Sequence, residues 1–134
     1  MAVGELVHVF YDKFWNEIDL AIADEILHED VTFRGSLGVG VVGRKAVCEY
    51  VLKVTEALSG YRCDIESLLV EGNRAVAKVV FSGLHAGEFL GYAPTGRRVQ
   101  WLGAAFFTED DNQLRDIWVL GDLENLKGQL SLTE

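Results

Sequence analysis

The sequence predicts a single α+β domain in which helices from the first half of the chain pack on an antiparallel sheet. Residues 2–58 carry apolar side chains mainly at helical spacing, whereas residues 61–121 read as strands separated by turns. Helices followed by antiparallel strands are typical of this class. The 134 residues contain no linker or repeat, and 49% of them are apolar. We therefore expect one domain, residues 1–134, with a substantial core.

The first helix is expected over residues 2–17, ending near Asn16. The residues at helical spacing along one side of this helix are Leu6, Val9, Phe10, Lys13 and Phe14. Val3 and Trp15 flank the same stripe. A shorter helix is expected at residues 19–27. A short strand at residues 31–34 follows it.

Residues 35–43 contain four glycines and no charged side chain, which predicts a loop folded over another part of the protein. Helical spacing returns over residues 44–58, and Gly60 is expected to stop that helix. The remaining elements are antiparallel strand pairs and a final helix. They are expected at residues 61–70 and 74–85 joined by a turn at 71–73, an irregular loop at 87–96, strands at 97–108 and 114–121, and a helix at 123–130.

The late strands are apolar on both alternating faces. One row of residues 97–107 contains Val99, Trp101, Gly103 and Ala105, and the other contains Leu102, Ala104 and Phe106. An antiparallel sheet with one face in water would alternate apolar and polar residues instead. We therefore expect one face to pack on the helices and the other on a second subunit, forming a homodimer.

The charge balance narrows the possible partners. The chain has 21 acidic and 12 basic residues, a formal charge of −9, which argues against nucleic acid and against an anionic membrane surface. No basic, apolar signal segment and no run of about 20 apolar residues is present. The two cysteines, Cys48 and Cys63, lack metal-binding spacing and read as reduced thiols. These features predict a cytoplasmic protein whose ligand is a small hydrophobic molecule.

Three segments resemble motifs of a known family. They are Leu27–Phe33 (LHEDVTF), His85–Arg97 (HAGEFLGYAPTGR), and Ile117–Trp118 followed by Asp122 and Gln129–Leu130. They are similar to the "hpD-v-f", "H-G-f-G-x-PTG-r" and "W-x-x-x-D … QL" elements of the SnoaL-like polyketide cyclases (ester cyclases), a branch of the NTF2-like superfamily. The resemblance spans nearly the whole chain.

This resemblance implies an NTF2-like cone, with N-terminal helices packed on a curved antiparallel sheet that encloses a cavity. Family cyclases close a ring by intramolecular aldol addition, with an aspartate at the position of Asp122 as acid and base. The resemblance implies no metal and no other cofactor. The aromatic-polyketide cyclases also tend to carry a histidine two residues before that aspartate, where this chain has Leu120.

Asp122 and His85 are the candidate catalytic residues. Asp122 shares strand parity with Trp118 and Leu120, so these three side chains are expected to point the same way. If that face borders the cavity, the carboxylate is desolvated and suits proton transfer. The alternative is a helix N-cap, since Asp122 directly precedes the last helix. His85 ends a strand and could relay a proton, or it could simply bond to the following loop.

In our interpretation, the residues that bind the substrate surround Asp122 and His85. These residues are aromatic or apolar apart from one arginine, and they are Trp118, Trp101, Arg34, Tyr50, Phe33, Tyr92 and Leu120. Core packing of the aromatic residues is the alternative, as is a surface position for Arg34. The segment Pro94–Gly96 is expected to be a turn that shapes the cavity rim.

Two functions remain open. The first is a cofactor-independent cyclase or isomerase that acts by acid–base catalysis on a small, hydrophobic, carbonyl-bearing, polyketide-like substrate. The second is a non-catalytic dimeric NTF2-like module that binds a hydrophobic small molecule, which Leu120 at the histidine position favours. The discriminating observation is whether Asp122 reaches a cavity or is used in capping the helix.

Overall fold

Six strands form one mixed sheet in the computed structural model, which describes residues 1–131. The spatial order is β2-β1-β6-β5-β4-β3. The strands are β1 (Leu27–Arg34), β2 (Gly40–Val42), β3 (Leu58–Glu71), β4 (Arg74–His85), β5 (Arg98–Asp110) and β6 (Gln113–Gly121). β3 to β6 pair antiparallel in sequence order, whereas β1 pairs parallel to β6 and β2 pairs antiparallel to β1.

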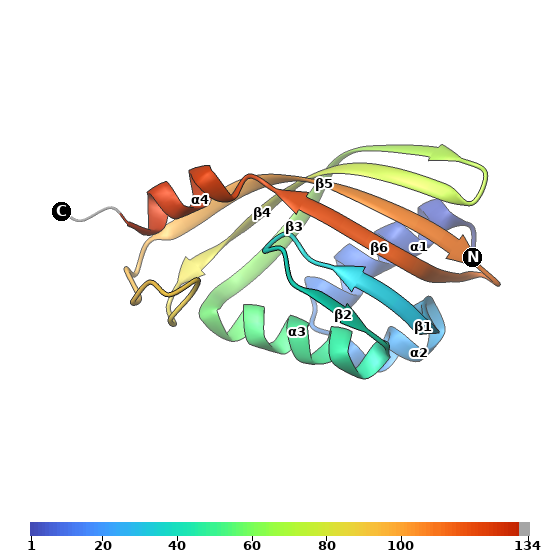
Figure 1. The fold of residues 1–134 in the computed structure, drawn as a ribbon, viewed down its shortest axis with the longest axis horizontal. Helices are drawn as coiled ribbons and strands as arrows, with labels where there is room; N and C mark the ends of the chain where they lie inside the picture. The colour runs from blue at the N-terminus through green and yellow to red at the C-terminus, as the bar shows by residue number, and fades with distance from the viewer. Residues whose placement is uncertain (132–134) are drawn as a thin grey trace.

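The helices are α1 (Val3–Val9), the π-helix η1 (Phe10–Trp15), the 3₁₀-helix η2 (Leu20–Ile22), α2 (Ala23–Ile26), α3 (Arg44–Ala57) and α4 (Leu123–Leu130). α1 and α3 lie on one face of this sheet, whereas α4 follows the end of β6 (Figure 1). α1 packs against β3 to β6, and α3 packs against β1 to β3. α4 packs on β5. The α+β class and the helices-on-a-sheet architecture are therefore confirmed. Within the described residues, no helix has the length and apolarity needed to cross a membrane.

The bounds of β4 and α4 match the sequence prediction, whereas other details differ. The sheet was predicted to be antiparallel, but β1 pairs parallel to β6, and β1 begins at Leu27, where a helix end was expected, rather than at residue 31. The predicted loop at 35–43 contains β2, because residues 40–42 pair with β1. Residue 58 already belongs to β3, so α3 ends at Ala57 and no glycine cap is used. Gly60 lies inside β3 with φ +64°, at an irregularity in the pairing with β4.

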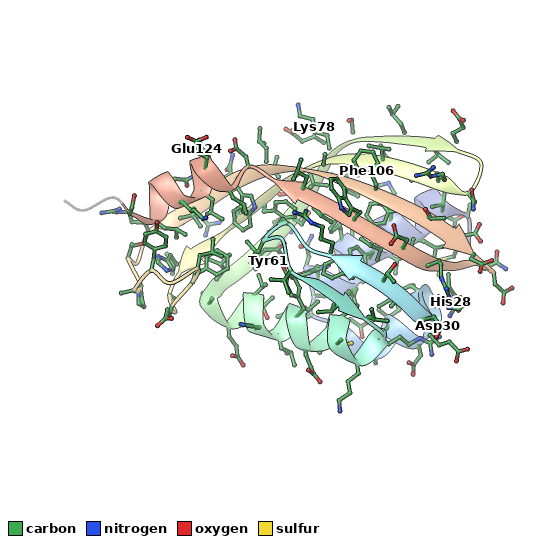
Figure 2. The ribbon with its side chains drawn as sticks, viewed as in Figure 1. His28, Asp30, Tyr61, Lys78, Phe106 and Glu124 are labelled. Atoms are coloured by element: carbon green, nitrogen blue, oxygen red, sulfur yellow. The ribbon has the colours of Figure 1, made fainter. Side chains whose placement is uncertain are left out.

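The two faces of the sheet differ in what covers them. The inner face, covered by α1, η1 and α3, carries buried side chains such as Val79, Trp101 and Val119. The outer face leaves large apolar side chains partly exposed, and they are Val76, Leu102, Phe106, Trp118 and Leu120. In Figure 2, Tyr61 lies between the sheet and α3, whereas Lys78 and Phe106 project from the sheet away from that space.

Candidate ligand-binding pocket

A pocket of two adjoining compartments lies between the helices and the inner face of the sheet. The inner chamber has a volume of about 20 Å³ and the outer cleft about 330 Å³. Leu37, Tyr50 and Val54 border both compartments. The chamber is lined by mainly aromatic side chains, which are Phe10, Tyr11, Trp15, Phe33, Ser36, Leu37, Tyr50, Val54, Tyr61, Phe81, Trp101 and Val119.

The outer cleft opens between α3 and the loop that follows β4. Val54 and Ala57 of α3 form one side of it, and Phe89 and Leu90 of the loop form another. The remaining lining residues are Leu37, Val39, Tyr50, Lys53, Glu88 and Gly91. Its volume lies at the lower end of the roughly 300–1,000 Å³ typical of small-molecule sites. The cleft can therefore hold the body of a small molecule, whereas the chamber can hold only an atom or two of it.

The π-helix η1 places two aromatic residues at the chamber. The backbone N–H of Asn16 donates to the carbonyl of Tyr11, five residues earlier, at 2.9 Å, and this wider turn is what defines a π-helix. Tyr11 and Trp15 are both buried, whereas Lys13 of the predicted stripe is exposed. The predicted stripe was wrong at Lys13, because the buried row passes through Phe10, Tyr11, Phe14 and Trp15 instead.

Asn16 fixes the end of η1 to β3. Its amide Nδ2 donates to the carbonyl of Cys63 at 2.9 Å, and its Oδ1 accepts from the backbone N–H of Cys63 at 2.8 Å. These two bonds satisfy both polar groups of the Cys63 backbone in a buried part of the chain. Trp15, the residue before Asn16, packs against Tyr61 of β3, with ring centroids 5.0 Å apart.

Two glycines on neighbouring strands make room for the aromatic floor of the chamber. Gly103 of β5 and Gly121 of β6 are direct partners in the sheet. A Cβ at Gly103 would lie 2.4 Å from the Phe81 ring, and a Cβ at Gly121 would lie 3.2 Å from Nε1 of Trp101. Phe81 and Trp101 pack on each other above these glycines, with ring centroids 5.1 Å apart. We call Gly103 and Gly121 the glycine pair.

The residues that line the chamber carry no formal charge. Burial raises the pKa of Tyr50 to about 12 and raises the pKa values of Tyr11 and Tyr61 well above the usual 10. These three residues, the chamber tyrosines, therefore remain neutral phenols at physiological pH. A neutral, aromatic chamber favours an uncharged part of a ligand.

Four buried polar atoms have no hydrogen-bond partner among the described residues. They are the Tyr11 hydroxyl, Nε1 of Trp15, Nε1 of Trp101 and Nε2 of His85. Buried polar atoms are normally paired, so each exception needs a physical explanation. The first three belong to residues that line the inner chamber.

His85 is fully buried and anchors the loop after β4. Its Nδ1 accepts from the backbone N–H of Thr95 at 3.2 Å and lies 3.0 Å from the Thr95 hydroxyl. Because Nδ1 accepts a hydrogen bond, the neutral ring carries its hydrogen on Nε2. The Phe89 ring lies beside it, 6.5 Å between centroids, and also contacts Trp101. His85 therefore lies behind the cleft wall and lines neither compartment.

Asp122 is exposed and caps α4. One carboxylate oxygen accepts from the backbone N–H of Asn125 at 3.2 Å. Trp118 and Leu120 share its strand parity, as expected, but they are 40% and 52% exposed on the outer face. The structure thus corrects the placement of these three residues beside the cavity. Alternate residues on both faces of β6 are apolar. The alternation therefore showed that these three side chains share a face, but not which face of the sheet it is.

The other predicted binding residues divide into two groups. Phe33, Tyr50 and Trp101 line the chamber. Arg34 donates to the carbonyl of Val119 and lies over the Trp118 ring at 5.1 Å, on the outer side of the sheet.

Tyr92 lies in the loop after β4, outside both compartments. Its backbone bonds to that of Phe89, with N–H to O distances of 2.9 and 3.1 Å in the two directions. The tight turn thus made brings Phe89, rather than Tyr92, to the cleft.

Sequence reasoning missed the chamber roles of Tyr11, Tyr61 and Phe81 and treated Trp15 only as a flank of the stripe. Strand parity placed Phe81 on the inward row with His85, but Phe81 was not counted among the binding residues. Tyr11 and Trp15 lie at helical spacing with Phe10 and Phe14, so helical periodicity could have found them. No group of three or more His, Cys, Asp or Glu side chains suited to a metal ion occurs within residues 1–131.

One family model matches most of the chain. The family model of the SnoaL-like polyketide cyclases matches residues 5–130. No curated protein matches the chain.

Solved structures share the fold over nearly the full length. TsrD from Streptomyces laurentii is 26% identical, with 96% of this chain and 94% of that chain covered and a TM-score of 0.85. A SnoaL-like protein from Jannaschia sp. CCS1 is 22% identical, with coverages of 98% and 93% and a TM-score of 0.89. A SnoaL-like polyketide cyclase from Agrobacterium tumefaciens is 18% identical, with coverages of 98% and 99% and a TM-score of 0.81.

Proposed function

Because the chain belongs to the SnoaL-like polyketide cyclase family, we propose that its pocket binds a small, largely apolar, carbonyl-bearing molecule. The observation that carries this proposal is the pair of neighbouring compartments, a cleft of about 330 Å³ and an aromatic chamber, which share Leu37, Tyr50 and Val54. Their walls are mainly aromatic and aliphatic, and aromatic side chains give large apolar contact with flat ligands.

Charge supports the same class of ligand. The chain carries a formal charge of −9, and the cleft presents one base and one acid, Lys53 and Glu88, both exposed. This arrangement offers no cationic cluster for a phosphate or another strongly anionic group. A neutral molecule of one or two fused rings, of the size of a short polyketide, fits the volume and the walls.

The test is direct binding with a variant that closes the passage between the compartments. Val54 borders both and is 5% exposed, whereas Leu52 on the same helix is 43% exposed. Isothermal titration with 2-acetylnaphthalene is expected to detect binding to the natural protein and to Leu52→Phe, and to lose it in Val54→Phe. Circular dichroism establishes that both variants are folded. Equal binding by both variants, or no binding to the natural protein, would contradict the proposal.

A second candidate function is turnover as a cofactor-independent cyclase or isomerase. The family match favours it. In this scheme Asp122 takes a proton from the carbon next to one carbonyl, that carbon bonds to the second carbonyl carbon, and the alkoxide so formed takes the proton back. Because Asp122 lies outside both compartments, the reacting carbonyls must reach it beyond the pocket. The step involves no oxidation or reduction.

Asp122→Asn separates chemistry from structure, because asparagine is as good an N-cap as aspartate. With 2,6-heptanedione as substrate, aldol closure and loss of water give a cyclohexenone that absorbs in the ultraviolet. We expect Asp122→Asn to abolish any such turnover and to melt like the natural protein. Full activity in this variant would remove Asp122 from the mechanism.

We also propose that the outer face of the sheet forms a homodimer interface. Its apolar residues include a contact between Phe106 and Trp118, with ring centroids 5.6 Å apart, and Leu120 is 52% exposed beside them. Exposed apolar clusters of this kind typically mark interaction surfaces. Sedimentation velocity should give a dimer for the natural protein and a monomer for Leu120→Glu. A monomeric natural protein would refute the dimer.

A cytoplasmic location is also part of the proposal, since Cys48 and Cys63 are both free thiols. Fractionation of the producing cell would test it.

A further inference from the structure

Three buried hydrogen-bond donors without a protein partner belong to residues that line the inner chamber. The Tyr11 hydroxyl and the indole N–H groups of Trp15 and Trp101 belong to side chains that are 2%, 4% and 2% exposed. An indole N–H can only donate. Three such groups on one small chamber are a strong departure from normal pairing, and they point to an acceptor supplied by a ligand.

These donors are held in place by packing rather than by flexible contacts. Tyr11 packs on Phe107, with ring centroids 5.9 Å apart, and Trp101 packs on Phe81 at 5.1 Å. Trp15 is fixed by Tyr61 and by the Asn16 bonds that follow it. Burial raises the pKa of Tyr11 well above 10, so its hydroxyl keeps its hydrogen. Donors fixed in advance favour a ligand oxygen at one position.

The volumes of the two compartments indicate which part of the ligand each of them can hold. The chamber, at about 20 Å³, has room for a single oxygen atom or methyl-sized group, whereas the adjoining cleft, at about 330 Å³, has room for a ring system. Because Tyr50 and Val54 border both, a ring lying in the cleft can extend one substituent into the chamber. The chamber lining holds no carboxylate, so an ammonium group would enter without a counter-charge.

We propose that Tyr11, Trp15 and Trp101 form a donor site that takes a carbonyl or enol oxygen of the ligand, while its rings occupy the outer cleft. This inference rests on the proposed function and deepens it, since it gives the orientation of the ligand and the residues that select it. The substrate class is a flat, neutral aryl or cyclic ketone whose acceptor oxygen projects from one end. A hydrocarbon of the same shape leaves the three donors unpaired.

The first test compares two probes of the same size, 2-acetylnaphthalene and 2-ethylnaphthalene, by isothermal titration. Each neutral hydrogen bond is worth a factor of roughly two to ten in affinity, so the ketone should bind at least about tenfold more tightly. Tyr11→Phe should reduce this preference to about threefold or less. Tyr92→Phe makes the same chemical change outside both compartments and should leave the preference unchanged.

The second test reads the indole groups directly. The chain has three tryptophans, and Trp118 lies on the outer face. In ¹H–¹⁵N spectra assigned with Trp→Phe variants, the indole resonances of Trp15 and Trp101 should move downfield with the ketone and much less with the hydrocarbon. The Trp118 resonance is the internal control and should move with neither.

The outcomes separate this inference from the proposed function. If both probes bind with equal affinity and the two chamber indoles respond equally, the pocket binds apolar molecules but the donor site is wrong. If neither probe binds, the proposed function fails, and the donor site fails with it. A ketone preference that survives Tyr11→Phe, without movement of the two indole resonances, would also overturn the assignment.

Discussion

Replacing Gly103 with alanine should destabilise the protein through one identifiable contact. A Cβ at this position would lie 2.4 Å from Cε2 and 3.0 Å from Cζ of Phe81. Real Cβ atoms do not approach that closely, so the ring or the strand must move. Phe81 is 3% exposed and packs on Trp101, so its ring has little space into which to move. The strain therefore falls on the floor of the chamber.

The expected loss in the free energy of unfolding is the difference between two opposing effects. Overpacking a tight core site costs about 1–3 kcal/mol, and replacing glycine returns roughly 0.5 kcal/mol by restricting the unfolded chain. The net loss is about 1.5 kcal/mol in the free energy of unfolding. For a chain of this size that corresponds to a Tm lower by roughly 5 °C. Urea unfolding followed by tryptophan fluorescence measures the first quantity, and differential scanning calorimetry measures the second.

Gly128→Ala is the matched control. Gly128 lies inside α4, and a Cβ there would meet nothing within 4 Å. The same substitution should therefore stabilise the protein by about 0.5–1 kcal/mol, because alanine is the better helix former. If Gly103→Ala proves neutral or stabilising, the tight packing of Phe81 over the glycine pair is not as described here.

Three further predictions concern stability. Asn16→Ala should lower the free energy of unfolding in urea by about 2–3 kcal/mol, because it leaves both backbone polar groups of Cys63 unpaired, and a loss below about 0.5 kcal/mol would contradict the anchoring role. Asp122→Ala should cost about 1 kcal/mol through loss of the α4 cap while Asp122→Asn costs little, and equal melting of the two variants would exclude a capping contribution. Burial raises the pKa of each chamber tyrosine, so above about pH 10 the unfolded chain loses protons that the folded chain keeps, and stability should fall as pH rises. Urea unfolding between about pH 8 and pH 11 would detect this fall, and a flat profile would mean that these tyrosines ionise normally when folded.

The regular elements were largely predictable because local patterns determine them. The turn residues around Gly72 predicted the β3–β4 hairpin. The helical spacing of apolar residues in 44–57 predicted α3. The short β2 was not predictable in the same way, because three residues of a glycine-rich segment become a strand only when β1 lies beside them. Pairing over a distance, rather than propensity, decides such elements.

The pocket was predictable only in part. The inner row that contains Trp101 was recognised as one face of a strand, and Phe33 and Tyr50 were recognised as candidate lining residues. The side on which Asp122 lies was not determined, because apolar residues occupy both rows of β6 and each row could equally well face the helices. The exposed cap position follows from tertiary packing. The alternative interpretation, a helix N-cap, describes its hydrogen bond in the structure.

The π-helix has a consequence for how this sequence can change. A π turn holds more residues than an α turn, so η1 behaves as an ordinary helix into which one residue has been inserted. Deleting exposed Lys13 would let the segment relax to α-helical geometry, in which each residue turns the chain by about 100°. Because the deletion removes only the extra residue, Trp15 can keep its place at the chamber and Asn16 can keep its two bonds to Cys63. The segment can thus lose one residue at this turn without loss of the pocket.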